Sequence, residues 1–226
     1  MIKSYNEIWM GYKFKLYKTI TRRLKKRSRY LSGILRKPAG VVGLLALGGA
    51  ASLILLNMHE TQKIHTAELL DTIAKVESRY NYNAYFGNAN NASIRFTDMT
   101  ISEVLAWQKQ FVNEGNASSA VGRYQFIDST LAGLVRQLNI DGSMKFDEAM
   151  QDRLAVALLE RRGIREYVDN KISREEFAHS LSKEWAALPK AKGDNPEQSY
   201  YAGDGLNKAQ LSLAEVYAGI ATVRKL

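Results

Sequence analysis

The chain has 226 residues, of which 46% are hydrophobic, and it contains no cysteine. This length suffices for one well-packed domain and an additional segment, and the absence of cysteine excludes disulfides and cysteine-ligated metals. The net charge of +9 is uneven, because residues 1–37 carry +11 and the rest of the chain carries −2. An anionic partner is therefore expected for this basic leader alone.

An apolar stretch, PAGVVGLLALGGAASLILLNM, occupies residues 38–58 without a charged side chain. A helix needs roughly 20 apolar residues to cross the hydrocarbon core of a bilayer, so the stretch predicts one transmembrane helix. A buried hairpin and the apolar part of a cleaved signal peptide are the alternatives, although the basic segment before it is long for a signal peptide.

The flanking charges predict the orientation of this helix. The segment before it is strongly basic, whereas HETQKIHTAELLD after it is not. The positive-inside rule places residues 1–37 in the cytoplasm and, after a linker at residues 59–65, a domain at residues 66–226 in the periplasm. The anchoring membrane would be the inner membrane or a virion membrane. Aromatic residues among the basic ones favour anionic lipid over DNA as the partner of the leader.

Helical signals dominate the predicted domain. Apolar periodicity and capping residues predict helices at residues 66–79, 101–111, 128–138, 146–163, 174–188 and 208–225. The helix starts rest on Thr100 with Glu103, on Asp128, on Ser173 with Glu176 and on Asn207. Residues 84–98 could form a small β-hairpin. The fold class is therefore mainly α with a minor sheet.

A glutamate in AKVESRY, residues 74–80, lies on the apolar side of the first predicted helix. At about 100° per residue, Glu77 falls about 40° from Ile73, within the apolar stripe. Desolvation should raise the pKa of this carboxyl group, and a glutamate with a raised pKa can act as a general acid at neutral pH. The alternative is a helix-end glutamate that reaches solvent or pairs with an arginine such as Arg123.

Four further stretches accompany the Glu-Ser pair at residues 77–78. They are FTD (96–98), GRYQ (122–125), LLERRG (158–163) and WAALP (185–189). Their order and spacing resemble the lysozyme-like lytic transglycosylases, more closely the lambda-type phage endolysins, over residues 66–224. The resemblance implies an α+β lysozyme-like domain with a small β-hairpin lobe. It also implies an enzyme that cleaves the β-1,4 bond between N-acetylmuramic acid (MurNAc) and N-acetylglucosamine (GlcNAc) in peptidoglycan, without cofactor or metal.

The resemblance also implies roles for individual residues. Glu77 would protonate the leaving oxygen and then act as a base toward the C6 hydroxyl of the sugar, which gives a 1,6-anhydro product without consuming water. Tyr124 and Gln125 would line the cleft and hold the N-acetyl group and the glutamate. The implied substrate-binding residues are Ser78, Tyr124, Gln125 and, from QSYYAGDG, Tyr200 or Tyr201. The sequence ESRYN departs from the family pattern, in which a glycine often follows the glutamate.

Ordinary retaining and inverting glycosidases use two carboxylates. Asp98 lies in a predicted loop and could reach the cleft, whereas Asp128 fits better as a helix cap. Neither is compelling, which favours the one-glutamate reaction over a water-using lysozyme. The three histidines are scattered, so no metal site is expected.

The sequence thus predicts a membrane-anchored, phage-encoded enzyme that degrades peptidoglycan for host lysis or for local opening of the wall. The weakly hydrophobic span would permit release of the anchor, whereas the long leader fits a permanently anchored, virion-associated enzyme better. An inactive glycan-binding module and a cytoplasmic nucleic-acid binder that acts through residues 1–37 are the alternatives from other classes.

Overall fold

Residues 63–226 are the part of the chain that the computed structural model describes. The leader at residues 1–37, the predicted transmembrane helix at 38–58 and most of the linker at 59–65 lie outside it. Within residues 63–226, no helix combines the length and the apolar character needed to cross a membrane.

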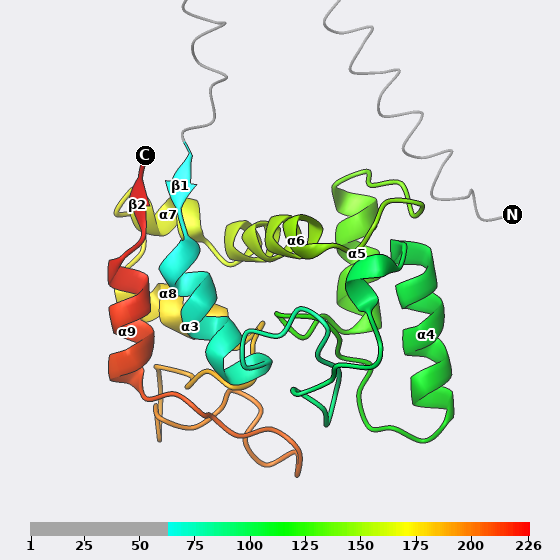
Figure 1. Ribbon diagram of the computed structural model, residues 1–226. Helices are drawn as coiled ribbons and strands as arrows, with labels where there is room; N and C mark the ends of the chain where they lie inside the picture. Colours follow the sequence, from blue (N-terminus) through cyan, green and yellow to red (C-terminus); the bar gives the residue numbers. More distant parts are fainter. Residues whose placement is uncertain (1–62) are drawn as a thin grey trace, which may run out of the picture. The chain divides into compact units, whose positions relative to one another are not determined.

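Helices are the main regular secondary structure of residues 63–226 (Figure 1). In chain order they are α3 (Ala67–Glu77), α4 (Ile101–Asn113), α5 (Asp128–Gln137), α6 (Glu148–Arg161), α7 (Ile164–Val168), α8 (Arg174–Ser182) and α9 (Leu213–Ala221), with the 3₁₀-helix η1 (Phe96–Asp98) before α4. Strands β1 (Ile64–His65) and β2 (Arg224–Lys225) pair antiparallel and form a two-stranded sheet. The prediction of a mainly helical domain with a minor sheet is confirmed.

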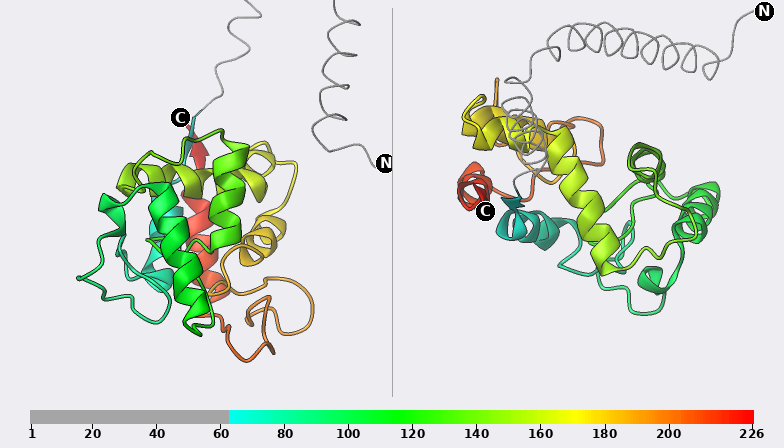
Figure 2. Two further views of the ribbon diagram at one scale, coloured as in Figure 1. Left: turned by 90° about the vertical axis from the view of Figure 1, so that its right-hand side faces the viewer. Right: turned by 90° about the horizontal axis from the view of Figure 1, so that it is seen from above.

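Helix α6 connects two groups of helices (Figures 1 and 2). It packs against α5, which packs against α4, and against α7, from which the contacts continue through α8 and α9 to α3. A helix enclosed in this way needs apolar side chains on more than one side. Its buried residues are Met150, Gln151, Leu154, Ala155, Ala157, Leu158 and Leu159.

The segment at residues 84–98 does not form the expected β-hairpin. Tyr85 makes an isolated bridge to Asn88, and no regular pair of strands follows within these residues. The side chain of the buried Asn91 instead accepts a hydrogen bond from the backbone N–H of Ile94 and donates one to the carbonyl of Ile94. Asparagine side chains thus satisfy backbone groups that a strand ladder would otherwise use.

The predicted capping boxes at the starts of α4 and α8 both form, which confirms these two helix starts. The predicted Asn207 cap is wrong, because Ser212 and Glu215 form a third capping box and α9 begins only after it. Asp128 is the first residue of α5 rather than its cap, and its carboxylate accepts a hydrogen bond from the Ser119 hydroxyl.

Two further boundaries differ from the expectation. Helix α6 spans Glu148–Arg161 rather than the predicted residues 146–163, and the chain soon re-enters a short helix, α7. Helix α8 ends at Ser182 rather than continuing toward Pro189. The residues that follow α8 turn inward and bring Trp185 into the core, where it is 3% exposed.

Candidate active site

Glu77 is the last residue of α3. Ile73 and Ala74 of the same helix are fully buried, so the helix presents its apolar side to the core near this end. Arg79 and Tyr80 follow with φ of 54° and 66°. Such left-handed conformations are uncommon outside glycine, and two in succession turn the chain sharply away from the helix axis. The glutamate therefore stands at the point where a buried helix meets a loop.

The carboxyl group of Glu77 is desolvated. Its Oε1 atom is buried and has no hydrogen-bond partner within residues 63–226. Burial raises the pKa of this group to about 7, and the backbone amide of Ala187 acts in the opposite direction. The predicted rise in pKa is confirmed. Pairing of Glu77 with Arg123 is not found, because Arg123 forms its ion pair with Asp71.

Two adjoining pockets meet at Glu77. The larger pocket, of about 500 Å³, lies between α3, the loop at residues 117–127 and the segment at residues 184–210. The smaller one, of about 300 Å³, is formed chiefly by residues 85–90. Glu77, Gly87 and Gln125 line both pockets. An extended polymer could therefore pass the carboxyl group and occupy space on either side of it.

The GRYQ stretch forms a tight turn beside Glu77. Gly122 has a φ of 80°, and a Cβ atom there would lie 2.4 Å from Oε1 of Gln151, so the position requires glycine. That same oxygen accepts the backbone N–H of Arg123 at 2.9 Å. Gln125 also has a positive φ, of 51°, and its Nε2 atom donates to the Gly122 carbonyl at 2.9 Å. The turn thus fixes the Gln125 side chain in the pocket wall.

Ser78 and Tyr124 lie behind the pockets that meet at Glu77. Ser78 has no exposed surface, and its hydroxyl donates to the carbonyl of Arg123 at 2.7 Å. It therefore joins the end of α3 to the GRYQ turn, and it lines neither of the two pockets that meet at Glu77. Tyr124 is 2% exposed and donates its hydroxyl to Asp152 at 2.7 Å.

Of the other predicted substrate-binding residues, Tyr201 lines a pocket at Glu77, whereas Tyr200 and Asp98 do not. Tyr201 lines the larger pocket and donates its hydroxyl to the carbonyl of Lys183 at 2.8 Å. Tyr200 is exposed and packs edge-on against the Tyr201 ring, outside the lining of the two pockets at Glu77. Asp98 pairs with Arg95 on the surface and also lies outside both linings. The structure thus brings Glu77, Gln125 and Tyr201 together.

A second carboxylate in the larger pocket was not predicted from the sequence. Glu184 follows α8, and its side chain is 6% exposed. It accepts hydrogen bonds from Nη2 of Arg161 at 2.8 and 2.9 Å and from Nε of Arg162 at 2.8 Å. The two arginines belong to LLERRG, and Glu184 directly precedes WAALP, so the ion pairs connect LLERRG to the residue before WAALP. The two guanidinium groups hold the Glu184 side chain in the pocket wall.

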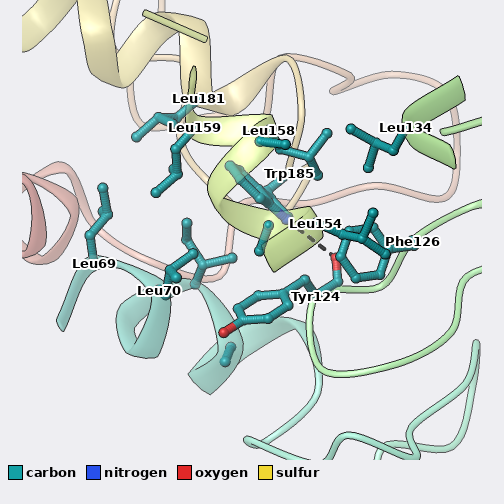
Figure 3. Close-up of a cluster of buried hydrophobic side chains, with 14 of the residues drawn as sticks. Leu69, Leu70, Tyr124, Phe126, Leu134, Leu154, Leu158, Leu159, Leu181 and Trp185 are labelled. Carbon is teal, nitrogen blue, oxygen red and sulfur yellow. Dashed lines mark hydrogen bonds between the residues drawn. The ribbon is translucent and has the colours of Figure 1, made fainter. Parts of the chain in front are cut away.

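Trp185 belongs to the core, and it also lines the larger pocket. Its indole Nε1 donates to the carbonyl of Tyr124 at 3.3 Å (Figure 3). Leu154 and Leu158 of α6 lie in the same cluster of buried side chains. The pocket wall at this point is thus continuous with the centre of the domain.

A glutamate with a pKa of about 7 where two open pockets meet is typical of enzymes that use a carboxylic acid as a proton donor. The chain belongs to the Endolysin family, whose model matches residues 61–209. Membership implies a bacteriolytic, peptidoglycan-degrading enzyme of bacteriophage origin. Neither a search of curated proteins nor a search of solved structures gave a match.

Proposed function

We propose that this endolysin is a peptidoglycan lytic transglycosylase that cleaves the β-1,4 bond between MurNAc and GlcNAc and forms 1,6-anhydro-MurNAc. The observation that carries the proposal is the state of Glu77, a desolvated carboxyl group with a pKa of about 7 and an unpaired Oε1 atom at the junction of two pockets. The lysozyme-like fold that the sequence resemblance implies is part of the same proposal.

The reaction needs one group that first donates and then accepts a proton. Protonated Glu77 donates its proton to the glycosidic oxygen as the bond from this oxygen to C1 of MurNAc breaks. The carboxylate so formed takes the proton of the C6 hydroxyl of the same sugar, and O6 forms the new bond to C1. Glu77 is then protonated again, and no water is consumed. A pKa near the working pH suits both steps.

The placement of the other carboxylates supports the one-glutamate reaction. A water-using glycosidase needs a second carboxylate, either as a nucleophile or as the base that activates water. Glu184 is the one other carboxylate in the lining of the two pockets at Glu77, and it is held by Arg161 and Arg162. To act as a nucleophile or base, Glu184 would have to leave these two guanidinium groups.

The neighbours of Glu77 would position it and the sugar. The hydroxyl of Ser78 and the turn at Gly122 hold the end of α3 and the pocket wall in fixed relation. The Nε2 atom of Gln125 donates one hydrogen bond to the Gly122 carbonyl, and its Oε1 atom would accept the N–H of an N-acetyl group. Tyr201 would offer its ring to a sugar face. Tyr124 would contribute indirectly, from its buried position behind the wall of the larger pocket.

The remaining proposals rest on the sequence alone. Residues 38–58 would anchor the enzyme in the inner membrane or in a virion membrane, with residues 1–37 on the cytoplasmic side against anionic lipid. The catalytic domain would then face the periplasm. Fractionation of cells that produce the chain, followed by extraction with carbonate and with detergent, tests this anchoring. Recovery of the chain in the soluble fraction would refute it.

Digestion of purified peptidoglycan tests the proposed reaction. The full chain, its Glu77→Gln variant and a Glu114→Gln variant as an exposed-glutamate control would be incubated with the polymer, and the released fragments weighed by mass spectrometry. We expect fragments one water lighter than reducing sugars, and a loss of at least about a hundredfold in rate for Glu77→Gln. Reducing-end fragments would show a hydrolase, and fragment release by Glu77→Gln at the wild-type rate would refute the role of Glu77.

A further inference from the structure

A small side pocket of about 190 Å³ adjoins the larger pocket. Glu184, Trp185 and Tyr201 line both, so they form a shared wall between the two spaces. Arg161 and Arg162, at the end of α6 and just after it, line the side pocket only. The proposed reaction makes no use of this space.

The side pocket is lined by more positive charge than its own carboxylate can neutralise. Arg161, Arg162 and Lys183 face a single acidic residue, Glu184, which leaves a formal charge of +2. Lys183 contacts the ring of Tyr200 at 5.5 Å, and its ammonium has no carboxylate partner within residues 63–226. Uncompensated cations at a partly enclosed site favour an anionic ligand, because solvent screens them less than it screens cations on an open surface.

The two arginines retain unused hydrogen-bond donors. Arg161 reaches Glu184 through Nη2 only, whereas Arg162 uses Nε for Glu184 and Nη2 for the Lys183 carbonyl. A guanidinium group has five N–H donors, so the Nη1 atoms of both residues stay available. Their side chains are 37% and 25% exposed, which leaves them accessible to a ligand. Glu184 thus orients two guanidinium groups without saturating them.

We propose that this side pocket binds a carboxylate of the peptide attached to MurNAc. The inference rests on the proposed function, in which a MurNAc residue lies beside Glu77. The lactyl group of MurNAc carries a short peptide with free carboxylates, whereas the sugar rings themselves are uncharged. A MurNAc ring in the larger pocket would direct its lactyl group toward the shared wall, and Lys183 with the two arginines would receive the acidic peptide. Charge-assisted hydrogen bonds from guanidinium to carboxylate are among the strongest in proteins.

Binding to defined fragments tests the inference. The full chain would carry Glu77→Gln to prevent cleavage, with Lys183→Gln added in one variant and Lys109→Gln in a matched control. Lys109 is an exposed lysine of α4 outside the linings of the pockets at Glu77 and of the side pocket. The probes are a MurNAc–GlcNAc tetrasaccharide with its peptides, a peptide-free GlcNAc tetrasaccharide without lactyl groups, and a third form, the first probe with its peptide carboxylates amidated. Affinities would be measured by calorimetry.

We expect Lys183→Gln to weaken binding of the peptide-bearing fragment about fivefold. The same substitution should leave the affinity for the peptide-free and amidated fragments unchanged, and Lys109→Gln should change none of the three. Equal weakening for all three fragments, or no weakening for any, would overturn the inference. Failure of the proposed function would appear separately, as the absence of cleavage products from wild-type protein despite peptide-dependent binding.

Discussion

Replacement of Glu77 by glutamine should abolish the loss of stability that ionisation of this side chain causes as the pH rises. The pKa of Glu77 is about 7 in the folded protein against 4.5 for an ordinary glutamate. Because the folded pKa is raised, the contribution of Glu77 to the free energy of unfolding is fully present below pH 4.5 and is lost as the pH rises to 7. Glutamine does not titrate, so the variant should not lose this contribution.

The size of the effect follows from the shift. Each pKa unit corresponds to about 1.4 kcal/mol, so the full shift amounts to about 3 kcal/mol. The pocket leaves part of the side chain in contact with solvent, which reduces the expected value to about 2–3 kcal/mol. The free energy of unfolding of Glu77→Gln, relative to wild type, should therefore rise by about 2–3 kcal/mol between pH 4 and pH 8.

Urea unfolding of both proteins across this pH range, monitored by tryptophan fluorescence, measures the difference in their free energies of unfolding directly. Other titrating groups are common to both proteins and cancel in the difference. A Glu175→Gln variant, altered at an exposed glutamate of α8, serves as the control and should change by less than about 0.5 kcal/mol. A difference curve for Glu77→Gln that is equally flat would refute the desolvation of Glu77, and with it the reason for its role as an acid.

Three further substitutions test the surroundings of Glu77. Gly122→Ala should lower stability by about 2 kcal/mol or more in thermal unfolding, because its Cβ would lie 2.4 Å from Oε1 of Gln151 at a φ of 80°. Ser78→Ala should cost about 1 kcal/mol and lower kcat more than it raises KM, because the hydrogen bond to the Arg123 carbonyl is lost. Glu184→Gln should cost about 2 kcal/mol in urea unfolding, because two guanidinium groups lose their carboxylate.

For each of these three substitutions, one experimental result would contradict the prediction. Gly133 lies inside α5, and a Cβ atom there would have no neighbour within 4 Å, so Gly133→Ala is the matched control for Gly122→Ala. Equal stability of the two alanine variants would show that the turn tolerates a side chain. Ser78→Ala with an unchanged kcat would remove Ser78 from the positioning of Glu77. Glu184→Gln with wild-type stability would show that the ion pairs contribute little.

The desolvated position of Glu77 could be predicted because its sequence signal is local. Eleven residues of α3 repeat apolar positions with the helical period, and Glu77 interrupts the stripe at the end of the helix. The capping boxes of α4 and α8 are local in the same way, since residues three apart decide them. The SLAE pattern at Ser212 carries the same signal, and it outweighs Asn207 because it satisfies two backbone N–H groups rather than one.

Glu184 could not be singled out, because its partners lie 22 and 23 residues earlier in the chain. Charged residues such as these are also common on solvated helix surfaces, and nothing in the periodicity marks them as buried. The hairpin expectation failed for a related reason. Asparagine side chains such as that of Asn91 replace strand pairing, and propensity alone does not reveal such side-chain hydrogen bonds.

The pairing of β1 with β2 brings the two ends of the described domain together. The backbone N–H of Leu226 donates to the carbonyl of Lys63, so the first and last described residues lie side by side (Figure 1). Helix α3 separates this point from Glu77 by about 16 Å along its axis. Adjacent ends permit circular permutation: a short peptide could join them, and new ends could open at the exposed turn near Asn170. Cargo inserted into the joining peptide would then be attached about 16 Å from Glu77 along α3.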